Sequence, residues 1–140
     1  MTSLPNYRPK KLSVGPLEQE ILNIIWELDG ATTKQIHQYI LADPDRELSY
    51  PTVTTVLQRL TQKGWLACDQ SDRAFVWQPL LSQAEAQLLQ AHERLNQFLA
   101  VTNPDMVAAF ADDLDRGSLN QLEAIADRIQ AIRQARQEEE

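Results

Sequence analysis

The residues whose types and spacing could do chemistry lie in one stretch of the chain, between residues 49 and 64. Thr54, Thr55 and Gln58 fall on one side of a helix drawn through this stretch. No Asp or Glu occurs from residue 49 to residue 68, although the chain holds 20 acidic residues. A helix that presses against phosphates cannot carry acids, whereas hydroxyl and amide groups can hydrogen-bond base edges. We therefore interpret the stretch as a DNA recognition helix in which these three side chains contact bases.

A second set of side chains around this helix is suited to phosphates rather than bases. Cations, hydroxyls and an indole N–H bind phosphate oxygens whatever the base sequence. The candidates for this role are Lys10, Lys11, Thr52, Arg59, Lys63, Arg73 and Trp77. The alternative is an ordinary amphipathic helix whose polar face is simply solvated. Its apolar face would consist of Val53, Val56, Leu57 and Leu60.

The charge of the chain bears on its partners. A net charge of −7 at first argues against nucleic acid. The acid is unevenly spread, however, because residues 1–81 hold eight Lys and Arg against nine Asp and Glu, whereas residues 82–140 hold five against eleven. Binding to DNA would then depend on a local basic surface and would weaken steeply with salt.

The composition also limits where the protein works. No apolar run is long enough to cross a bilayer, and the N-terminus has no hydrophobic signal core. Cys68 is the only cysteine, which excludes a disulfide framework within the chain. We expect a soluble, cytoplasmic protein that is not inserted in a membrane.

The elements expected before residue 82 begin with a flexible arm and two helices. Residues 1–13 hold two prolines and three cations without apolar periodicity, so we expect this arm to be mobile. Pro16 suits the first turn of a helix, and Asp29-Gly30 ends it. Thr32 can cap a second helix, with Gln35 completing a capping box.

A third helix and a β-hairpin are predicted after these two helices. Ser49 can cap this helix, and Gly64 can end it. Two strand-like runs at 65–70 and 74–78 flank a turn-prone tip that carries Arg73. Three helices and then a hairpin are the order of a winged helix-turn-helix domain, which we assign to residues 14–81. The fold class is mainly α.

Residues 82–140 are predicted to form a helical dimerisation domain. A helix opens at Ser82, a second is capped by Asn103, and a third is capped by Ser118 after Gly117. Each has one narrow apolar stripe, which makes little core alone but would be buried against a second copy. The stripe residues assigned to a homodimer contact are Leu88, Leu95, Phe98, Phe110, Leu119, Leu122 and Ile129. The alternative is that these stripes pack against the first domain of the same chain.

Taken together, these residues resemble the penicillinase-repressor family of winged-helix transcriptional regulators (the BlaI/MecI/CopY group). The resemblance spans most of the chain and is strongest from about residue 15 to residue 81. It is carried by Glu20-Ile21-Leu22 and Ile24-Ile25-Trp26 in the first helix, by Ser49, Thr52-Val53, Thr55, Leu57 and Arg59-Leu60 in the third, and by Lys63-Gly64, Arg73, Phe75, Trp77 and Pro79 after it.

The resemblance implies a homodimeric repressor that covers an operator of dyad symmetry and blocks transcription. In the family, release commonly follows cleavage within the dimerisation region, triggered by a membrane-bound sensor metalloprotease. The dipeptide cut in the penicillinase branch is Asn-Phe, and the matching position here is Ala109-Phe110. The family's copper branch uses cysteine pairs near the C-terminus, which this chain lacks. Pro51 stands where the family often has a basic residue, and Asp72 replaces a glycine of the wing.

The sequence contains no motif that indicates an enzyme. His92-Glu93 begins like a zinc-protease motif, but Asn96 stands where the second histidine is needed. There is no Gly-rich phosphate loop, so we assign no catalytic residue, metal or cofactor. Two alternatives to a repressor stay open. One is a protein-interaction module built on a winged helix, and the other is a regulator that senses a ligand directly or redox change through Cys68.

Overall fold

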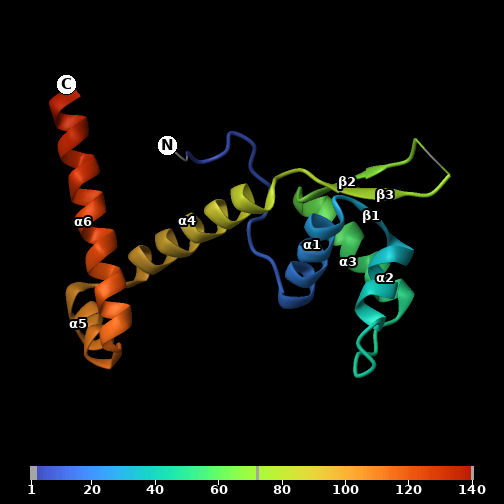
Figure 1. Cartoon of the computed structure of the whole chain (residues 1–140), viewed down its shortest axis with the longest axis horizontal. Coiled ribbons are helices and arrows are strands. Elements are labelled where there is room, and N and C mark those ends of the chain that lie inside the picture. Colours follow the sequence, from blue (N-terminus) through green and yellow to red (C-terminus); the bar gives the residue numbers. More distant parts are fainter. Residues whose placement is uncertain (1–2, 72, 140) are drawn as a thin grey trace. The chain divides into compact units, whose positions relative to one another are not determined.

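The computed structural model describes residues 3–71 and 73–139, and the chain divides into two compact units, Met1–Asn96 and Gln97–Glu140. The first unit contains α1 (Pro16–Leu28), β1 (Ala31–Thr32), α2 (Thr33–Leu41), α3 (Tyr50–Lys63), β2 (Leu66–Asp69) and β3 (Val76–Pro79) (Figure 1). It also contains most of α4 (Gln83–Val101). Three helices followed by an antiparallel hairpin form a winged helix-turn-helix, as the sequence predicted.

Local capping groups set the ends of the helices. The Thr32 hydroxyl accepts from the Gln35 backbone N–H at 3.2 Å, and the Ser49 hydroxyl accepts from the Thr52 N–H at 3.2 Å. Gly64 ends α3 with a left-handed φ of 92°. Each of these groups satisfies backbone donors or acceptors that a helix end leaves unpaired, so these predicted boundaries are confirmed.

The sheet has one strand more than the sequence predicted. The strand order is β1-β3-β2, and both pairings are antiparallel. Trp77 pairs with Ala31 of β1 on one side and with Cys68 of β2 on the other. β1 is only two residues long, so it has no alternation of its own, and its pairing with β3 defines it.

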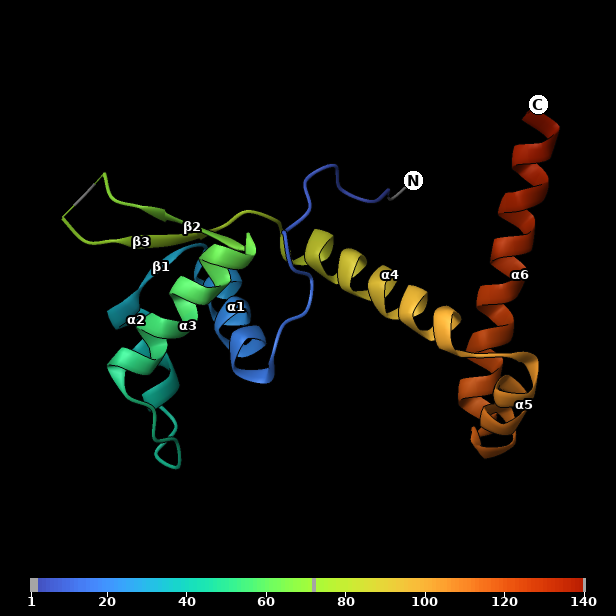
Figure 2. The same ribbon diagram turned by 180° about the vertical axis from the view of Figure 1, so that it is seen from behind.

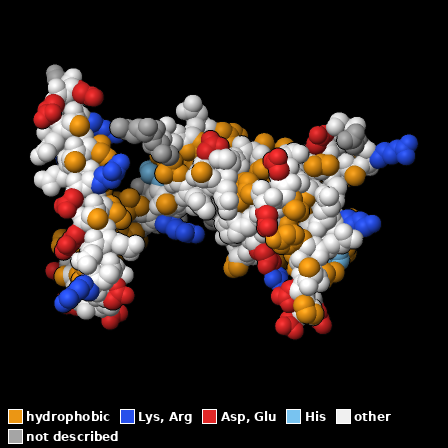
Figure 3. Space-filling model, viewed as in Figure 1, with side chains coloured by type: hydrophobic (Ala, Val, Ile, Leu, Met, Phe, Trp, Pro, Cys, Tyr) orange, Lys and Arg blue, Asp and Glu red, His pale blue; other side chains and the backbone are white. Residues whose placement is uncertain are grey.

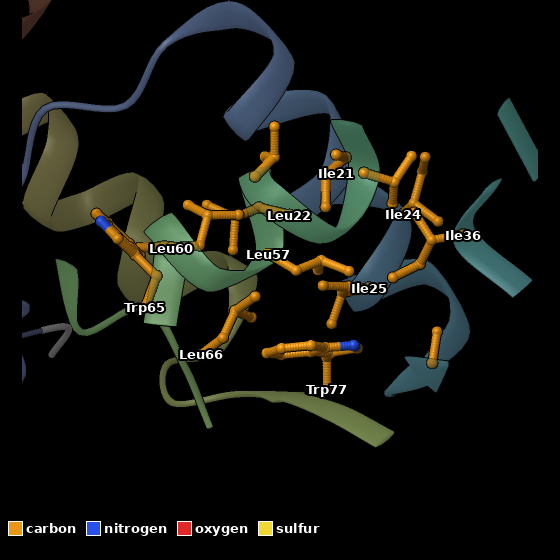
Figure 4. Packing of buried hydrophobic residues seen from close by; sticks show 14 of the residues in the cluster. Ile21, Leu22, Ile24, Ile25, Ile36, Leu57, Leu60, Trp65, Leu66 and Trp77 are labelled. Atoms are coloured by element: carbon orange, nitrogen blue, oxygen red, sulfur yellow. The ribbon is translucent and has the colours of Figure 1, made fainter. Parts of the chain in front are cut away.

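The core of the first unit lies between α1, α3 and the sheet. Ile21, Leu22 and Ile25 from α1 point toward Leu57 and Leu60 from α3 in the close-up of Figure 4. All five are fully buried. Their spacing places them on single helical faces, which is why α3 buries one side and leaves the other outside.

The segment expected to be a flexible arm makes specific contacts with the end of α3. The Tyr7 hydroxyl donates to the Gly64 carbonyl at 2.7 Å, and the Lys11 N–H donates to the Lys63 carbonyl at 3.2 Å. The Trp65 indole N–H donates to the Lys11 carbonyl at 3.0 Å. A Cβ on Gly64 would lie 3.1 Å from the Tyr7 hydroxyl oxygen, so glycine also permits this close approach. These contacts join residues 7–11 to the end of α3, and the flexibility of the arm stays a prediction.

The boundary between the two parts also differs from the prediction. We placed it after residue 81, but the units divide after Asn96. Ala86 and Leu89 of α4 are buried in the core of the first unit, and the Gln90 side chain donates to that of Gln19 at 2.9 Å. The first half of α4 therefore belongs with the winged helix-turn-helix, while Leu88 beside it is half-buried.

The second unit consists of the end of α4, α5 (Pro104–Asp113) and α6 (Arg116–Glu139). Asn103 caps α5 as predicted, since its side-chain oxygen accepts from the Met106 N–H at 3.0 Å. The predicted cap of the last helix was wrong: α6 begins at Arg116, and the Asp115 carboxylate accepts from the Ser118 N–H at 2.7 Å. An Asp preceding the helix can accept from the first-turn N–H groups as well as a Ser can, and here it stands three residues earlier.

Candidate nucleic-acid interface

The outer face of α3 presents the three predicted base-reading side chains. Thr55 and Gln58 are exposed, and Thr54 is half-buried. The Thr54 hydroxyl donates to the Tyr50 carbonyl at 3.2 Å, and the Thr55 hydroxyl donates to the Pro51 carbonyl at 3.0 Å. Because each hydroxyl hydrogen is taken, the two threonines offer oxygen lone pairs and methyl groups. Such groups can accept from base amines and contact thymine methyls, while the Gln58 amide offers both donors and an acceptor.

The acidic side chains near α3 come from other elements. Figure 3 shows Asp and Glu over α1 and over the loop after α2, where the chain carries Glu20, Asp43, Asp45 and Glu47. Figure 2 gives the opposite view of the ribbon, in which α3 and the wing strands β2 and β3 face the reader. α3 itself carries no Asp or Glu, whereas Asp69 is exposed at the end of β2.

Four of the predicted phosphate-binding cations are exposed around α3. Arg59 is exposed on the helix itself, and Arg73 is exposed at the tip of the wing. Lys10 and Lys11 are exposed, and the backbone of Lys11 is held beside the C-terminal end of α3. Thr52 is exposed in the first turn, where its hydroxyl lies 2.7 Å from that of Ser49. Asp72, the acid replacing a wing glycine, lies outside the described residues.

Two residues assigned to phosphate are held inside the domain instead. The Lys63 ammonium donates to Glu18 Oε1 at 2.9 Å and to the Ser13 carbonyl at 3.0 Å. The Trp77 side chain is 7% exposed, and its indole N–H donates to the Thr33 hydroxyl at 3.0 Å. Two of the three Lys63 ammonium hydrogens and the Trp77 indole hydrogen therefore have internal partners, and the phosphate roles of Lys63 and Trp77 stay predictions. The sequence placed both near the surface but could not show a partner 45 or 44 residues away.

The ion pair formed by Lys63 joins the end of α3 to the start of α1. Glu18 is 6% exposed, and its Oε2 has no hydrogen-bond partner among the described residues. Burial would raise the pKa of this carboxyl, but hydrogen bonds from Lys63 and from the Gly15 N–H outweigh burial and lower the pKa. The ionised pair therefore fixes the C-terminal end of α3.

The N-terminal end of α3 is fixed by the loop that precedes it. Arg46 in this loop makes a bidentate salt bridge with Glu20 of α1, at 2.6 and 2.8 Å. The Arg46 guanidinium also lowers the pKa of the Glu20 carboxyl. A His37 ring nitrogen of α2 lies 2.7 Å from the Leu48 carbonyl. Both ends of α3 are therefore tied to the helices behind it.

A groove of about 700 Å³ lies between α3 and the wing. Tyr50, Thr54 and Gln58 line it from α3, while Phe75 and Trp77 line it from the wing. Cys68, Thr33 and three further polar residues complete the lining. None of the lining residues is charged, so within the described part of the chain this groove has a neutral and largely apolar surface.

Comparison with known proteins shows which family matches the chain. The model of the penicillinase repressor family matches residues 14–131. The chain belongs to the penicillinase repressor family. It is 35% identical over 72 residues to a Mycobacterium tuberculosis protein named transcriptional regulator BlaI, covering 51% of each chain. It therefore spans about half the length of that relative. It is 27% identical over 111 residues to the penicillinase repressor of Bacillus licheniformis, covering 78% of this chain and 85% of the relative.

Among solved structures, the DNA-binding domain of the repressor BlaI is similar, with a TM-score of 0.46 and 26% identity. The match covers 54% of this chain and 92% of that domain. The family is one of transcriptional regulators rather than enzymes.

The geometry of this family member also reveals site residues that the sequence did not indicate. Tyr50 and Phe75 are 49% and 56% exposed and line the groove beside the reading face. The signal that could have indicated Phe75 is an aromatic residue in the wing, directly before β3. Glu18 carried no comparable signal, because its partner Lys63 is distant in sequence.

In residues 3–71 and 73–139, no group of three or more His, Cys, Asp or Glu side chains could hold a metal ion. None of the helices in these residues combines the length and the apolar character needed to span a bilayer.

Proposed function

We propose that this penicillinase repressor family member is a sequence-specific, DNA-binding transcriptional repressor that acts in the cytoplasm. The observation that carries the proposal is the exposed face of α3, which offers Thr55 and Gln58 without any carboxylate. Arg59, Lys11 and Arg73 surround this face and would bind the backbone on either side of the groove that α3 enters.

Selection from random duplexes tests this proposal and supplies the operator sequence. From a random library, the protein should retain duplexes that share one base sequence, and its affinity for them should fall as the salt concentration rises. Retention of every duplex equally, or of none at low salt, would mean that α3 does not read bases. Binding of a protein partner without DNA would favour the interaction-module alternative.

The side chain of Gln58 should determine one base position of the selected operator. Gln58→Ala removes a bidentate amide contact, which is worth roughly 1–3 kcal/mol of discrimination. We expect the preference at that position to fall about tenfold or more when selection is repeated, while other positions keep theirs. Gln38→Ala, on an exposed position of α2, is the matched control and should leave the selected sequence unchanged. An unaltered preference in Gln58→Ala would remove Gln58 from the set of base-reading residues.

We further propose that the repressor is a homodimer that covers an operator of dyad symmetry. None of the described residues from 97 to 139 is buried. Exposed apolar side chains on these residues are Phe98, Leu99, Val101, Met106, Val107, Phe110, Leu114, Leu122, Ile125 and Ile129. A unit with so much exposed apolar surface gains stability by pairing with a second copy. Of the predicted dimer contacts, Leu95 is 54% exposed, and Leu119 is half-buried.

Release from DNA by proteolysis at Ala109-Phe110, through a membrane-bound sensor metalloprotease, completes the proposal. Both residues lie within α5, and the Phe110 ring contacts that of Phe98 with centroids 6.0 Å apart. A protease needs an extended chain, so α5 must open locally. In the single chain, a ten-residue helix without a buried residue opens at low free-energy cost.

Mass spectrometry of the chain recovered from induced cells tests this cleavage. We expect fragments 1–109 and 110–140, and Phe110→Asp should abolish them because an apolar side chain after the cut bond is replaced by a charge. Met106→Asp, on the same helix, is the control that should still be cut. Cleavage elsewhere, or equal cleavage of Phe110→Asp, would contradict the assignment.

A further inference from the structure

The groove between α3 and the wing continues the surface proposed to bind DNA. Thr54 and Gln58 belong both to the reading face and to the wall of the groove. Whatever strand of DNA runs past the reading face must therefore pass beside this groove.

The chemistry of the groove differs from that of a phosphate site. Its described lining has no cation, its floor includes Trp77 at 7% exposure, and its rim carries the Phe75 ring at 56% exposure. Phosphates bind cations or several N–H and O–H donors. The Thr and Gln side chains of the groove can supply such donors, but the Phe75 ring supplies none, and the Trp77 indole N–H already donates to the Thr33 hydroxyl. The uncharged part of a DNA strand is its deoxyribose rings, whose C–H faces pack against apolar and aromatic surfaces as other hydrocarbon groups do.

We propose that this groove holds one strand of the duplex by its deoxyribose rings, with Phe75 as the main apolar contact. The inference rests on the proposed DNA-binding function and adds to it a contact without charge. Arg73 at the wing tip then binds a phosphate of the same region. The wing thus contributes one salt-dependent contact and one salt-independent contact, two residues apart.

The salt dependence of affinity separates these two contacts. For wild type, Phe75→Ala, Phe75→Leu and Arg73→Ala, dissociation constants are measured on the selected duplex and on a scrambled duplex over a range of KCl concentrations. Phe75→Ala should weaken binding about tenfold at every salt concentration, since an apolar contact releases no counterions. Phe75→Leu should keep most of the affinity. Arg73→Ala should lower the slope of log affinity against log salt by about 0.9.

The comparison of the two duplexes identifies the partner atoms. Every duplex has deoxyribose, so Phe75→Ala should weaken both complexes by the same factor. A loss confined to the selected duplex would mean that Phe75 contacts a base and would overturn the proposal. Wild-type affinity in Phe75→Ala, or a changed salt slope, would overturn it as well. If wild type binds neither duplex, the proposed function itself fails, which is a different outcome.

Nuclear Overhauser effects provide an independent readout. In the wild-type complex with the selected duplex, the Phe75 ring should show effects to deoxyribose protons. If these effects are absent and the signals of the groove residues do not change on saturation with DNA, the groove does not bind DNA and the proposal is refuted. Because Phe75 is more than half exposed, the free Phe75→Ala protein should unfold at the wild-type temperature.

Discussion

Leu122→Asp combined with Ile129→Asp should convert the protein from a dimer into a monomer of 16.0 kDa. The two residues lie seven positions apart on α6 and are both 53% exposed in the single chain. Burying two unpaired carboxylates in an apolar contact between copies would cost far more than the contact provides. Light scattering after size-exclusion chromatography gives the mass directly.

The loss of the dimer should weaken operator binding by at least about 100-fold, because the second half-site is no longer bound at high effective concentration. Asn120→Asp with Ala131→Asp is the matched control, since it adds the same two charges to the opposite side of α6. A dimeric Leu122→Asp, Ile129→Asp variant, or a monomer with full operator affinity, would contradict the dimer proposal.

Lys63→Met should destabilise the first unit by about 3 kcal/mol, because it leaves the Glu18 carboxylate buried without its partner. All three tryptophans, Trp26, Trp65 and Trp77, lie in this unit, so tryptophan fluorescence during urea unfolding reports on it alone. Adding Glu18→Gln should recover part of the loss, since the amide still accepts from the Gly15 N–H without burying a charge.

The exposed Lys34 of α2 provides the control, and Lys34→Met should change the stability by less than about 0.5 kcal/mol. Equal effects of Lys63→Met and Lys34→Met would show that the ion pair contributes nothing. The pair also predicts a pH dependence. The folded-state pKa of Glu18 is lowered from its ordinary value of 4.5, so its stabilisation is fully present above pH 4.5 and is lost as the pH falls through the lowered pKa. Glu18→Gln should reduce this loss in acid.

The features that the sequence predicted correctly are local ones. Thr32, Ser49 and Gly64 act on backbone groups within four residues of themselves, so their chemistry is visible in a short window. The apolar spacing of α3 is likewise local, and it leaves Thr55 and Gln58 on the outside. For the same reason the order of helices and hairpin sufficed for the fold class.

The features that the sequence could not predict depend on distant partners. Lys63 and Arg59 look alike in the sequence, but Lys63 forms a direct ion pair with Glu18 whereas Arg59 is exposed. Trp77 lies on β3, and it is buried in the core with its indole N–H donating to Thr33, 44 residues away. The observed boundary lies after the predicted one because α4 buries Leu89, rather than its neighbour Leu88, in the core of the first unit. A pair of adjacent leucines such as Leu88-Leu89 gives no local sign of which one the same chain buries.

We propose that the carboxylate-free face of α3 enters the major groove of duplex DNA. Amide chemical-shift mapping of the labelled protein with the selected duplex tests it most directly. We predict that the largest changes fall on Thr54, Thr55 and Gln58 and on the wing near Arg73, while the amides of Glu20 and Asp43 on the acidic side stay unchanged. Changes centred on that acidic side, with α3 unaffected at saturation, would contradict it.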